Sequence, residues 1–107
     1  MKRFLFVCSQ NKLRSPTAEQ VFAGRDGIEV LSAGTNHDAE VPVTEEAIVW
    51  ADMVFVMEPV HRGKLRTRFR RVLNGTPIVC LGIPDDFGFM EPELVRLLEA
   101  RMARLLG

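Results

Sequence analysis

Short apolar runs alternate along the chain with longer segments in which apolar residues recur every three or four positions. The runs at residues 2–7, 28–32, 52–57 and 77–81 are typical of strands that are buried on both faces of a parallel sheet. Helical spacing follows each of the first three runs and returns near the C-terminus. This alternation predicts an α/β fold in three αβα layers, with helices on both faces of a four-stranded parallel sheet.

Proline and small polar residues mark where the helices should begin. Ser15 followed by Pro16 is typical of an N-cap and a first helical position, and Thr44 can cap a second helix. A third helix should follow Pro59 and a last one should begin at Pro92. The third is predicted to be one continuous helix with a single apolar side, made by Leu65, Phe69, Val72 and Leu73. The stripe of the last helix is made by Leu94, Leu97, Leu98, Met102 and Leu105, and this spacing favours core packing.

Length and composition predict one globular domain over residues 1–107. The chain can bury a single core, and its 47% hydrophobic and 26% charged residues are ordinary for a globular protein. Its apolar runs are far shorter than the roughly 20 residues that span a bilayer, so we expect no membrane segment and a soluble, cytoplasmic protein. Two cysteines are too few for the disulfide framework of a small secreted domain.

The formal net charge is zero, but the charges are unevenly distributed. Residues 36–58 hold six acidic and no basic side chains, whereas residues 62–71 hold six basic and no acidic ones. Two solvated faces explain this distribution, and a patch for an acidic partner or a nucleic acid is the alternative. Because Phe69 is the one aromatic residue within the basic stretch, we do not expect a nucleic-acid partner.

The loop of residues 8–14, hereafter loop 8–14, leaves the carboxyl end of the first predicted strand, where open parallel sheets bind ligands. Its backbone N–H groups can form an anion-binding nest, supported by the positive end of the following helix. The same field favours the thiolate of Cys8, which is the nucleophilic form of a cysteine. Arg14 can hold two phosphate oxygens with its planar guanidinium, and Ser15 can donate its hydroxyl to the thiolate.

The motif Cys-x5-Arg-Ser after the first strand resembles that of the low-molecular-weight protein tyrosine phosphatases. Asn11 within the loop, Ser-Pro-Thr-Ala-Glu at residues 15–19 and Leu-Ser-Ala-Gly-Thr at residues 31–35 are similar to that family as well. Residues 83–88, Ile-Pro-Asp-Asp-Phe-Gly, resemble its acid loop, although Asp86 stands where the family usually has proline. The resemblance touches both catalytic segments and most of the chain.

The resemblance implies a phosphate monoester hydrolase, in particular a protein tyrosine phosphatase, that works through a phosphocysteine. Cys8 would be the nucleophile, Arg14 would bind phosphate, and Asp85 would act as general acid and then as base, with Asp86 as the alternative acid. Asn11 would brace the loop and Ser15 would tune the thiolate. The residues expected to bind substrate are Ser9, Gln10, Asn11, Lys12, Leu13, Ser15 and Phe87, the last as a wall for an aromatic substrate.

The expected partners are a phosphorylated protein or a small phosphate ester, and a phosphate or sulfate ion should bind in loop 8–14. We expect no cofactor and no metal, since His37 and His61 stand without ligand partners at a metal-binding spacing. His61 should pack on the apolar side of its helix.

Two other functions remain open at this point. A thiol-dependent arsenate reductase on the same fold would use Cys80 as a resolving thiol and form a Cys8–Cys80 disulfide, whereas a buried structural thiol is the simpler interpretation of Cys80. A regulatory module that binds phosphate without turnover is the third hypothesis.

Overall fold

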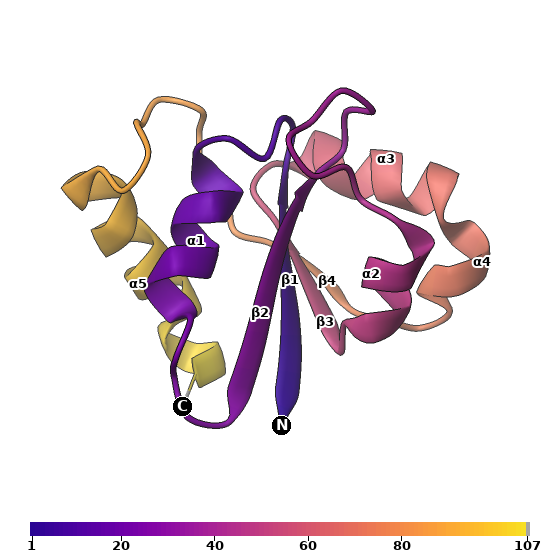
Figure 1. Cartoon of the computed structure of the whole chain (residues 1–107), viewed down its shortest axis with the longest axis horizontal. Coiled ribbons are helices and arrows are strands. Elements are labelled where there is room, and N and C mark those ends of the chain that lie inside the picture. Colours follow the sequence, from indigo (N-terminus) through magenta and orange to yellow (C-terminus); the bar gives the residue numbers. More distant parts are fainter. Residues whose placement is uncertain (107) are drawn as a thin grey trace.

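Four parallel strands form the centre of the molecule in this computed structural model, which describes residues 1–106. The predicted domain ends at Gly107, which lies outside the described residues. The strands are β1 (Lys2–Cys8), β2 (Ile28–Gly34), β3 (Met53–Val56) and β4 (Ile78–Cys80), arranged in the order β2-β1-β3-β4 (Figure 1). The predicted four-stranded parallel sheet is therefore confirmed, with strand ends within two residues of the expected ones.

Helices cover both faces of this sheet, which confirms the three-layer αβα prediction. Helices α1 (Arg14–Phe22) and α5 (Pro92–Leu106) lie on one face, and α2 (Glu45–Trp50), α3 (Pro59–Arg68) and α4 (Arg70–Leu73) lie on the other (Figure 1). Successive side chains of β1 point to opposite faces, so each face has its own hydrophobic core.

The core beneath α1 and α5 is aromatic. Phe6 stacks between Phe22 and Phe55, with ring centroids 5.7 and 5.4 Å away, and Phe4 meets Phe55 edge-on at 5.0 Å. The predicted stripe of α5 supplies three fully buried side chains to the same core: Leu94, Leu98 and Met102. This core extends to Cys8, which places the thiol on the α1 and α5 side of the sheet.

Cys80 packs on the other face of the sheet. It adjoins the core that is formed by Leu5, Val7 and the helices α2 to α4, and its side chain is partly buried. Both cysteines are free thiols. The sheet therefore separates Cys80 from Cys8, and a disulfide between them would require β1 or β4 to turn over.

Two details of the predicted helices are wrong. Helix α1 begins at Arg14 rather than after Ser15, and Leu13 occupies the N-cap position without a side-chain bond. Ser15 is fully buried inside the first turn, so its hydroxyl is available for another partner. The third predicted helix is interrupted at Phe69, whose backbone ψ is 28°, so that α3 ends before this residue and α4 begins after it.

The predicted cap of α2 is confirmed, because Thr44 Oγ1 accepts the Ala47 N–H at 3.1 Å.

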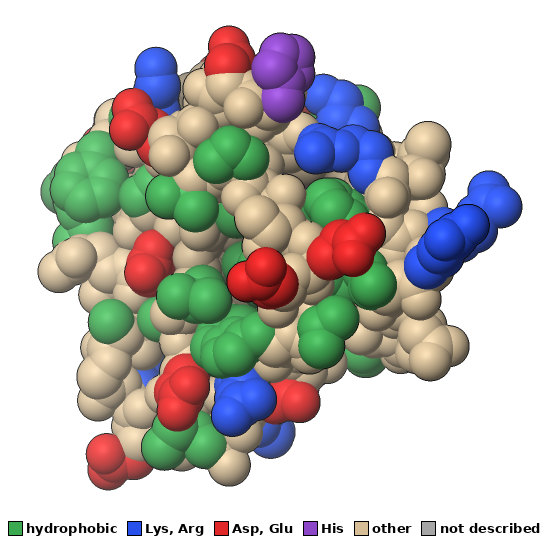
Figure 2. Space-filling view, turned by 45° about the vertical axis from the view of Figure 1, so that its right-hand side comes forward, with side chains coloured by type: hydrophobic (Ala, Val, Ile, Leu, Met, Phe, Trp, Pro, Cys, Tyr) green, Lys and Arg blue, Asp and Glu red, His purple; other side chains and the backbone are tan. Residues whose placement is uncertain are grey.

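The charged side chains are distributed over the surface in separate groups. Figure 2 shows the side that carries α2 and α4, where basic groups lie toward the upper right and right edges and acidic side chains lie near the centre. The five basic side chains at positions 64, 66, 68, 70 and 71 are exposed, and Arg62 is partly buried with Nη2 3.3 Å from the Ile78 carbonyl. Among residues 1–106, no helix is both long and apolar enough to cross a membrane.

Candidate active site

Loop 8–14 and the segment that follows β4 meet at the carboxyl end of the sheet. Between them lies a pocket of about 130 Å³. Seven residues line it: Cys8, Ser9, Gln10, Lys12, Leu13, Arg14 and Asp85. The structure therefore brings together two segments that are more than 70 residues apart, as the shared position of their strand ends predicts.

The Cys8 thiol is held at the bottom of this pocket by two hydrogen-bond partners. Ser15 Oγ lies 2.9 Å from Cys8 Sγ, and the Asn11 backbone N–H donates to the same sulfur at 3.3 Å. Asn11 has a φ of 56°, in the left-handed region that asparagine tolerates better than most residues. This conformation turns its N–H toward the sulfur, as in an anion-binding nest. Both groups can therefore donate a hydrogen bond to the sulfur.

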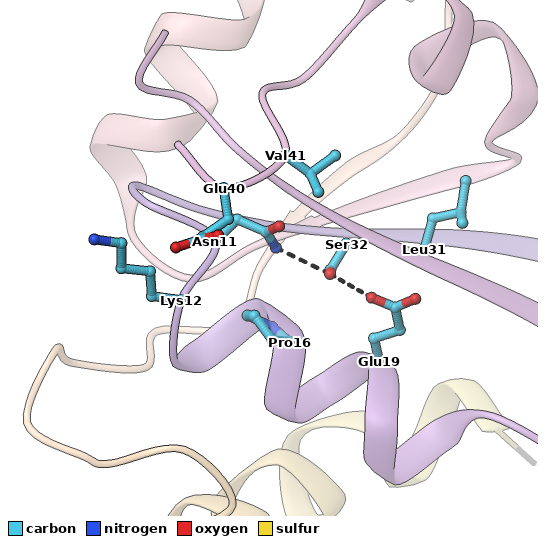
Figure 3. A pocket seen from close by; sticks show the side chains of 8 residues that line it. All are labelled: Asn11, Lys12, Pro16, Glu19, Leu31, Ser32, Glu40 and Val41. Carbon is cyan, nitrogen blue, oxygen red and sulfur yellow. Dashed lines mark hydrogen bonds between the residues drawn. The ribbon is translucent and has the colours of Figure 1, made fainter. Parts of the chain in front are cut away.

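A chain of side-chain hydrogen bonds limits the acceptors that are open to the Ser15 hydroxyl. Asn11 Nδ2 donates to Ser15 Oγ and to Ser32 Oγ, each at 2.9 Å, and Ser32 in turn donates to Glu19 (Figure 3). Since Ser15 Oγ accepts from Asn11, its own hydrogen is left for Cys8 Sγ or for the Ala33 carbonyl at 3.3 Å. Through these bonds Asn11 links loop 8–14 to α1 and to β2.

Backbone contacts from the segment after β2 support loop 8–14 from behind. The N–H groups of Thr35, Asn36 and Glu40 donate to the carbonyls of the first three loop residues at 2.8 to 3.0 Å. Gly34 lies so close that a Cβ there would stand 2.6 Å from the Ser9 carbonyl oxygen and 3.0 Å from the Asn11 nitrogen. This contact requires glycine at position 34, because no side chain fits.

Arg14 is held across the pocket from the thiol by three partners on two segments, the start of α3 and the stretch after β4. Its Nη1 donates to the Ile83 carbonyl at 2.8 Å and to Glu58 Oε2 at 2.5 Å, and its Nε lies 3.6 Å from Asp85 Oδ1. The side chain is 3% exposed. Its guanidinium lowers the pKa of Glu58 from the ordinary value of 4.5 by hydrogen bonding and by its charge, against a smaller opposing effect of burial. The Glu58 carboxylate therefore stays ionised and keeps Arg14 oriented.

The two neighbouring aspartates differ in position. Both side chains are exposed, but Asp85 lines the pocket with Oδ1 3.6 Å from Arg14 Nε, whereas Asp86 does not line the pocket. Phe87 does not line the pocket either, because it packs partly buried against the aromatic core. The contact of Phe87 with an aromatic substrate stays a prediction. Apolar surface at the mouth is supplied by Leu13, which is 37% exposed.

Two residues of this site, Glu58 and His61, were missed as site residues by the sequence analysis. They form a capping box at the start of α3, in which each side chain binds the other residue's backbone N–H. The sequence already contains a signal for this helix start. Glu58 can accept a hydrogen bond at the N-cap, Pro59 follows it, and the polar His61 stands three residues after Glu58. His61 is buried as predicted, but both ring nitrogens are hydrogen-bonded.

A wider cavity of about 560 Å³ adjoins loop 8–14 on the side of β2. Figure 3 shows its lining, with Lys12 at one end and Leu31 at the other. Lys12 lines both this cavity and the Cys8 pocket, so the two cavities lie side by side.

Among residues 1–106, no group of three or more His, Cys, Asp or Glu side chains is placed to hold a metal ion.

Comparisons with known proteins agree with this geometry. Residues 3–53 match the profile of the family described as low molecular weight phosphotyrosine protein phosphatase. This match covers β1, loop 8–14, α1 and β2, and therefore the Cys-x5-Arg-Ser motif. No curated protein matches the sequence of the chain.

Solved structures match over nearly the whole chain. The YwlE arginine phosphatase from Geobacillus stearothermophilus is 26% identical, with a TM-score of 0.78 over 99% of this chain and 91% of that one. A YwlE mutant with a phosphorylated active-site serine is also 26% identical, with a TM-score of 0.73 over 97% and 95% of the two chains. SP-PTP, a low-molecular-weight protein tyrosine phosphatase from Streptococcus pyogenes, is 18% identical, with a TM-score of 0.79 over 100% and 95%.

Proposed function

We propose that this chain is a member of the low-molecular-weight phosphotyrosine protein phosphatase family, which its residues 3–53 match, and that it hydrolyses phosphate monoesters through a phosphocysteine formed on Cys8. The family consists of cysteine-dependent phosphatases, and the proposed reaction class is that of the family. The residue roles and the substrate are our proposal for this chain.

In the first step, the Cys8 thiolate attacks phosphorus opposite the leaving oxygen. The S–P bond forms as the bond from phosphorus to that oxygen breaks, and Asp85 gives its proton to the departing alkoxide or phenoxide. The Arg14 guanidinium holds two non-bridging oxygens, while the N–H groups of loop 8–14 hold the third. Bound phosphate replaces Asp85 as the ionic partner of Arg14 Nε, which frees that carboxyl for the leaving group.

In the second step, a water molecule attacks the phosphocysteine. Asp85, now ionised, accepts a proton from the water as the new P–O bond forms and the S–P bond breaks. The leaving group is the Cys8 thiolate, which Ser15 and the Asn11 N–H stabilise through the hydrogen bonds described above. Phosphate is released and the enzyme returns to its starting state.

One observation carries this proposal: a thiol with two hydrogen-bond donors, a buried arginine and a carboxyl from a distant loop surround one 130 Å³ pocket. The pocket has the size of a phosphoryl group with part of its leaving group. A YwlE mutant carries phosphate on its active-site serine, which is the kind of covalent intermediate we propose for Cys8.

For the substrate we propose phosphotyrosine in a protein. Leu13 offers an aromatic ring apolar contact at the mouth of the pocket, and Lys12 adds a positive charge beside it. The S. pyogenes protein is named a tyrosine phosphatase, whereas the more similar Geobacillus protein is named an arginine phosphatase. Phosphoarginine is therefore the second substrate to test.

We further propose that the protein works in the reducing cytoplasm, because both cysteines are free thiols.

The test is hydrolysis of p-nitrophenyl phosphate between pH 4.5 and 8 without added metal. Cys8→Ser should abolish turnover, and Asp85→Asn should lower kcat by about 10²-fold or more. Asp86→Asn is the matched control, since the neighbouring carboxyl lies outside the pocket, and it should stay near the wild-type rate. Wild-type rates on phosphotyrosine and phosphoarginine peptides then identify the substrate.

The same assay separates the alternatives. A folded, reduced wild-type protein without turnover would refute the phosphatase and leave a phosphate-binding module, which binding of inorganic phosphate would reveal. If Asp86→Asn lost activity and Asp85→Asn did not, the assignment of the acid would be wrong. Arsenate-dependent oxidation of a thiol would support the reductase, although the sheet between Cys8 and Cys80 gives that function no support.

A further inference from the structure

His61 is a buried titratable side chain that the proposed mechanism does not use. It lies in the first turn of α3, directly behind loop 8–14, and is 0% exposed. Its Nδ1 accepts the backbone N–H of Glu58 at 3.1 Å, and its Nε2 lies 2.9 Å from Ser9 Oγ. A buried imidazole needs a partner for each ring nitrogen, and here the partner of Nε2 is the residue next to the nucleophile.

These two bonds fix the tautomer of His61. The backbone N–H of Glu58 can only donate, so Nδ1 must present its lone pair and the ring proton of the neutral imidazole resides on Nε2. Nε2 therefore donates to Ser9 Oγ. Burial, followed by the charge of Arg14, lowers the pKa of His61 from 6.5 to about 4, so the neutral form prevails at neutral pH. Besides Arg14, the charged groups that act on the ring are Glu58, Lys64 and Asp85.

The Ser9 hydroxyl is left with a hydrogen to give. Its oxygen is used as an acceptor by His61, so its O–H must point away from the imidazole. Ser9 lines the Cys8 pocket, and within residues 1–106 no side chain other than His61 is hydrogen-bonded to its hydroxyl. An anion in the pocket is the natural acceptor for that hydrogen, because hydrogen bonds to charged groups are stronger than neutral ones.

We propose that the Ser9 hydroxyl donates a hydrogen bond to the bound phosphoryl group and that His61 is the positioning residue that orients it. The ligand class rests on the proposed function, but the orientation of Ser9 does not. His61 also reaches the other end of loop 8–14, because its partner Glu58 holds Arg14. One imidazole thus supports the two residues that flank the pocket.

The test compares Ser9→Ala with Ser9→Thr, which keeps a hydroxyl. Titration calorimetry with inorganic phosphate measures binding without turnover, and inhibition of p-nitrophenyl phosphate hydrolysis by phosphate measures it again. Ser9→Ala should weaken phosphate binding on the order of tenfold, and Ser9→Thr should stay within about threefold of the wild type. Ser9→Ala leaves the Nε2–H of the buried His61 without its acceptor, so its melting temperature should fall, whereas that of Ser9→Thr should stay near the wild-type value.

His61→Phe, alone and combined with Ser9→Ala, tests the positioning part. If His61 acts through Ser9, the double variant should lose less phosphate affinity than the product of the two single losses. Equal phosphate binding by Ser9→Ala and the wild type would overturn the proposal, and a double variant that loses the full product would overturn the part assigned to His61. If His61→Phe does not fold, the Ser9 pair decides alone.

These outcomes remain separate from the proposed function. If the wild type binds phosphate but shows no Cys8-dependent turnover, the phosphatase fails while the calorimetric comparison still tests Ser9. If turnover is present and Ser9→Ala binds phosphate as the wild type does, the phosphatase stands and the inference about Ser9 fails.

Discussion

Acid should destabilise this protein through His61. The pKa of its imidazole is lowered from 6.5 to about 4 in the folded protein, first by burial and then by Arg14. Between these values the unfolded chain binds a proton that the folded protein does not, so the free energy of unfolding falls as the pH falls. At about 1.36 kcal/mol per pKa unit, this amounts to about 2 kcal/mol between pH 7.5 and pH 5, and about 3 kcal/mol by pH 4.

Urea unfolding at pH 7.5, 6.5, 5.5 and 5 measures this loss. Glu58, whose pKa is lowered from 4.5, contributes stability that is lost only as the pH falls further, through its folded pKa, so its effect lies mostly below this window. His61→Phe should be less stable at neutral pH but should lose about 2 kcal/mol less on acidification. His37→Gln is the matched control, because this histidine is exposed, and its pH dependence should equal that of the wild type.

Two results would refute this reasoning. One is an equal fall in stability for the wild type and for His61→Phe between pH 7.5 and pH 5. The other is an NMR titration of the His61 ring in the folded protein with a midpoint near 6.5 rather than near 4. The NMR measurement needs only the wild type, so it decides the matter even if His61→Phe does not fold.

Three further predictions concern backbone contacts and the second thiol. Gly34→Ala should abolish phosphate binding by displacing loop 8–14, whereas Gly63→Ala, whose Cβ meets nothing within 4 Å, should stabilise the protein by about 0.5–1 kcal/mol in urea unfolding. Cys80→Ala should leave turnover unchanged, and mass spectrometry after mild oxidation should show no intramolecular bond to Cys8, in contrast to a resolving thiol. Thr44→Ala should cost about 1 kcal/mol of unfolding free energy through the lost cap of α2, and an unchanged urea midpoint would contradict that cap.

Sequence reasoning was most successful where one local pattern has one structural solution. The four apolar runs became the four strands, and the apolar stripe of the last helix became buried core in α5. The sequence-based prediction was wrong at Phe69. Four apolar residues at helical spacing predicted one continuous helix, but the structure has two helices with a break between them. Phe69 is buried in the core on this face of the sheet, and such a tertiary contact cannot be deduced from local spacing.

The helix start at Ser15 shows the same limit at the active site. Ser15-Pro16 is a sound N-cap signal by itself, but the hydroxyl is committed to Cys8 Sγ at 2.9 Å and Leu13 takes the cap position. Similarly, the sequence predicted that Phe87 would line the pocket, but its side chain packs partly buried against the aromatic core. In both cases a tertiary partner competed with the local preference, and burial decided the outcome.

By itself, the sequence determined the fold class, the position of loop 8–14 at a strand end, and the residue types for a covalent phosphoryl transfer. These follow from hydrophobic periodicity and from spacing along the chain, which are local properties. Only the tertiary structure decided that Asp85 rather than Asp86 faces Arg14, that Cys80 lies across the sheet from Cys8, and that His61 supports Ser9. Each of these concerns the relative placement of residues far apart in the chain, and the direction of such a side chain is set by packing rather than by sequence spacing.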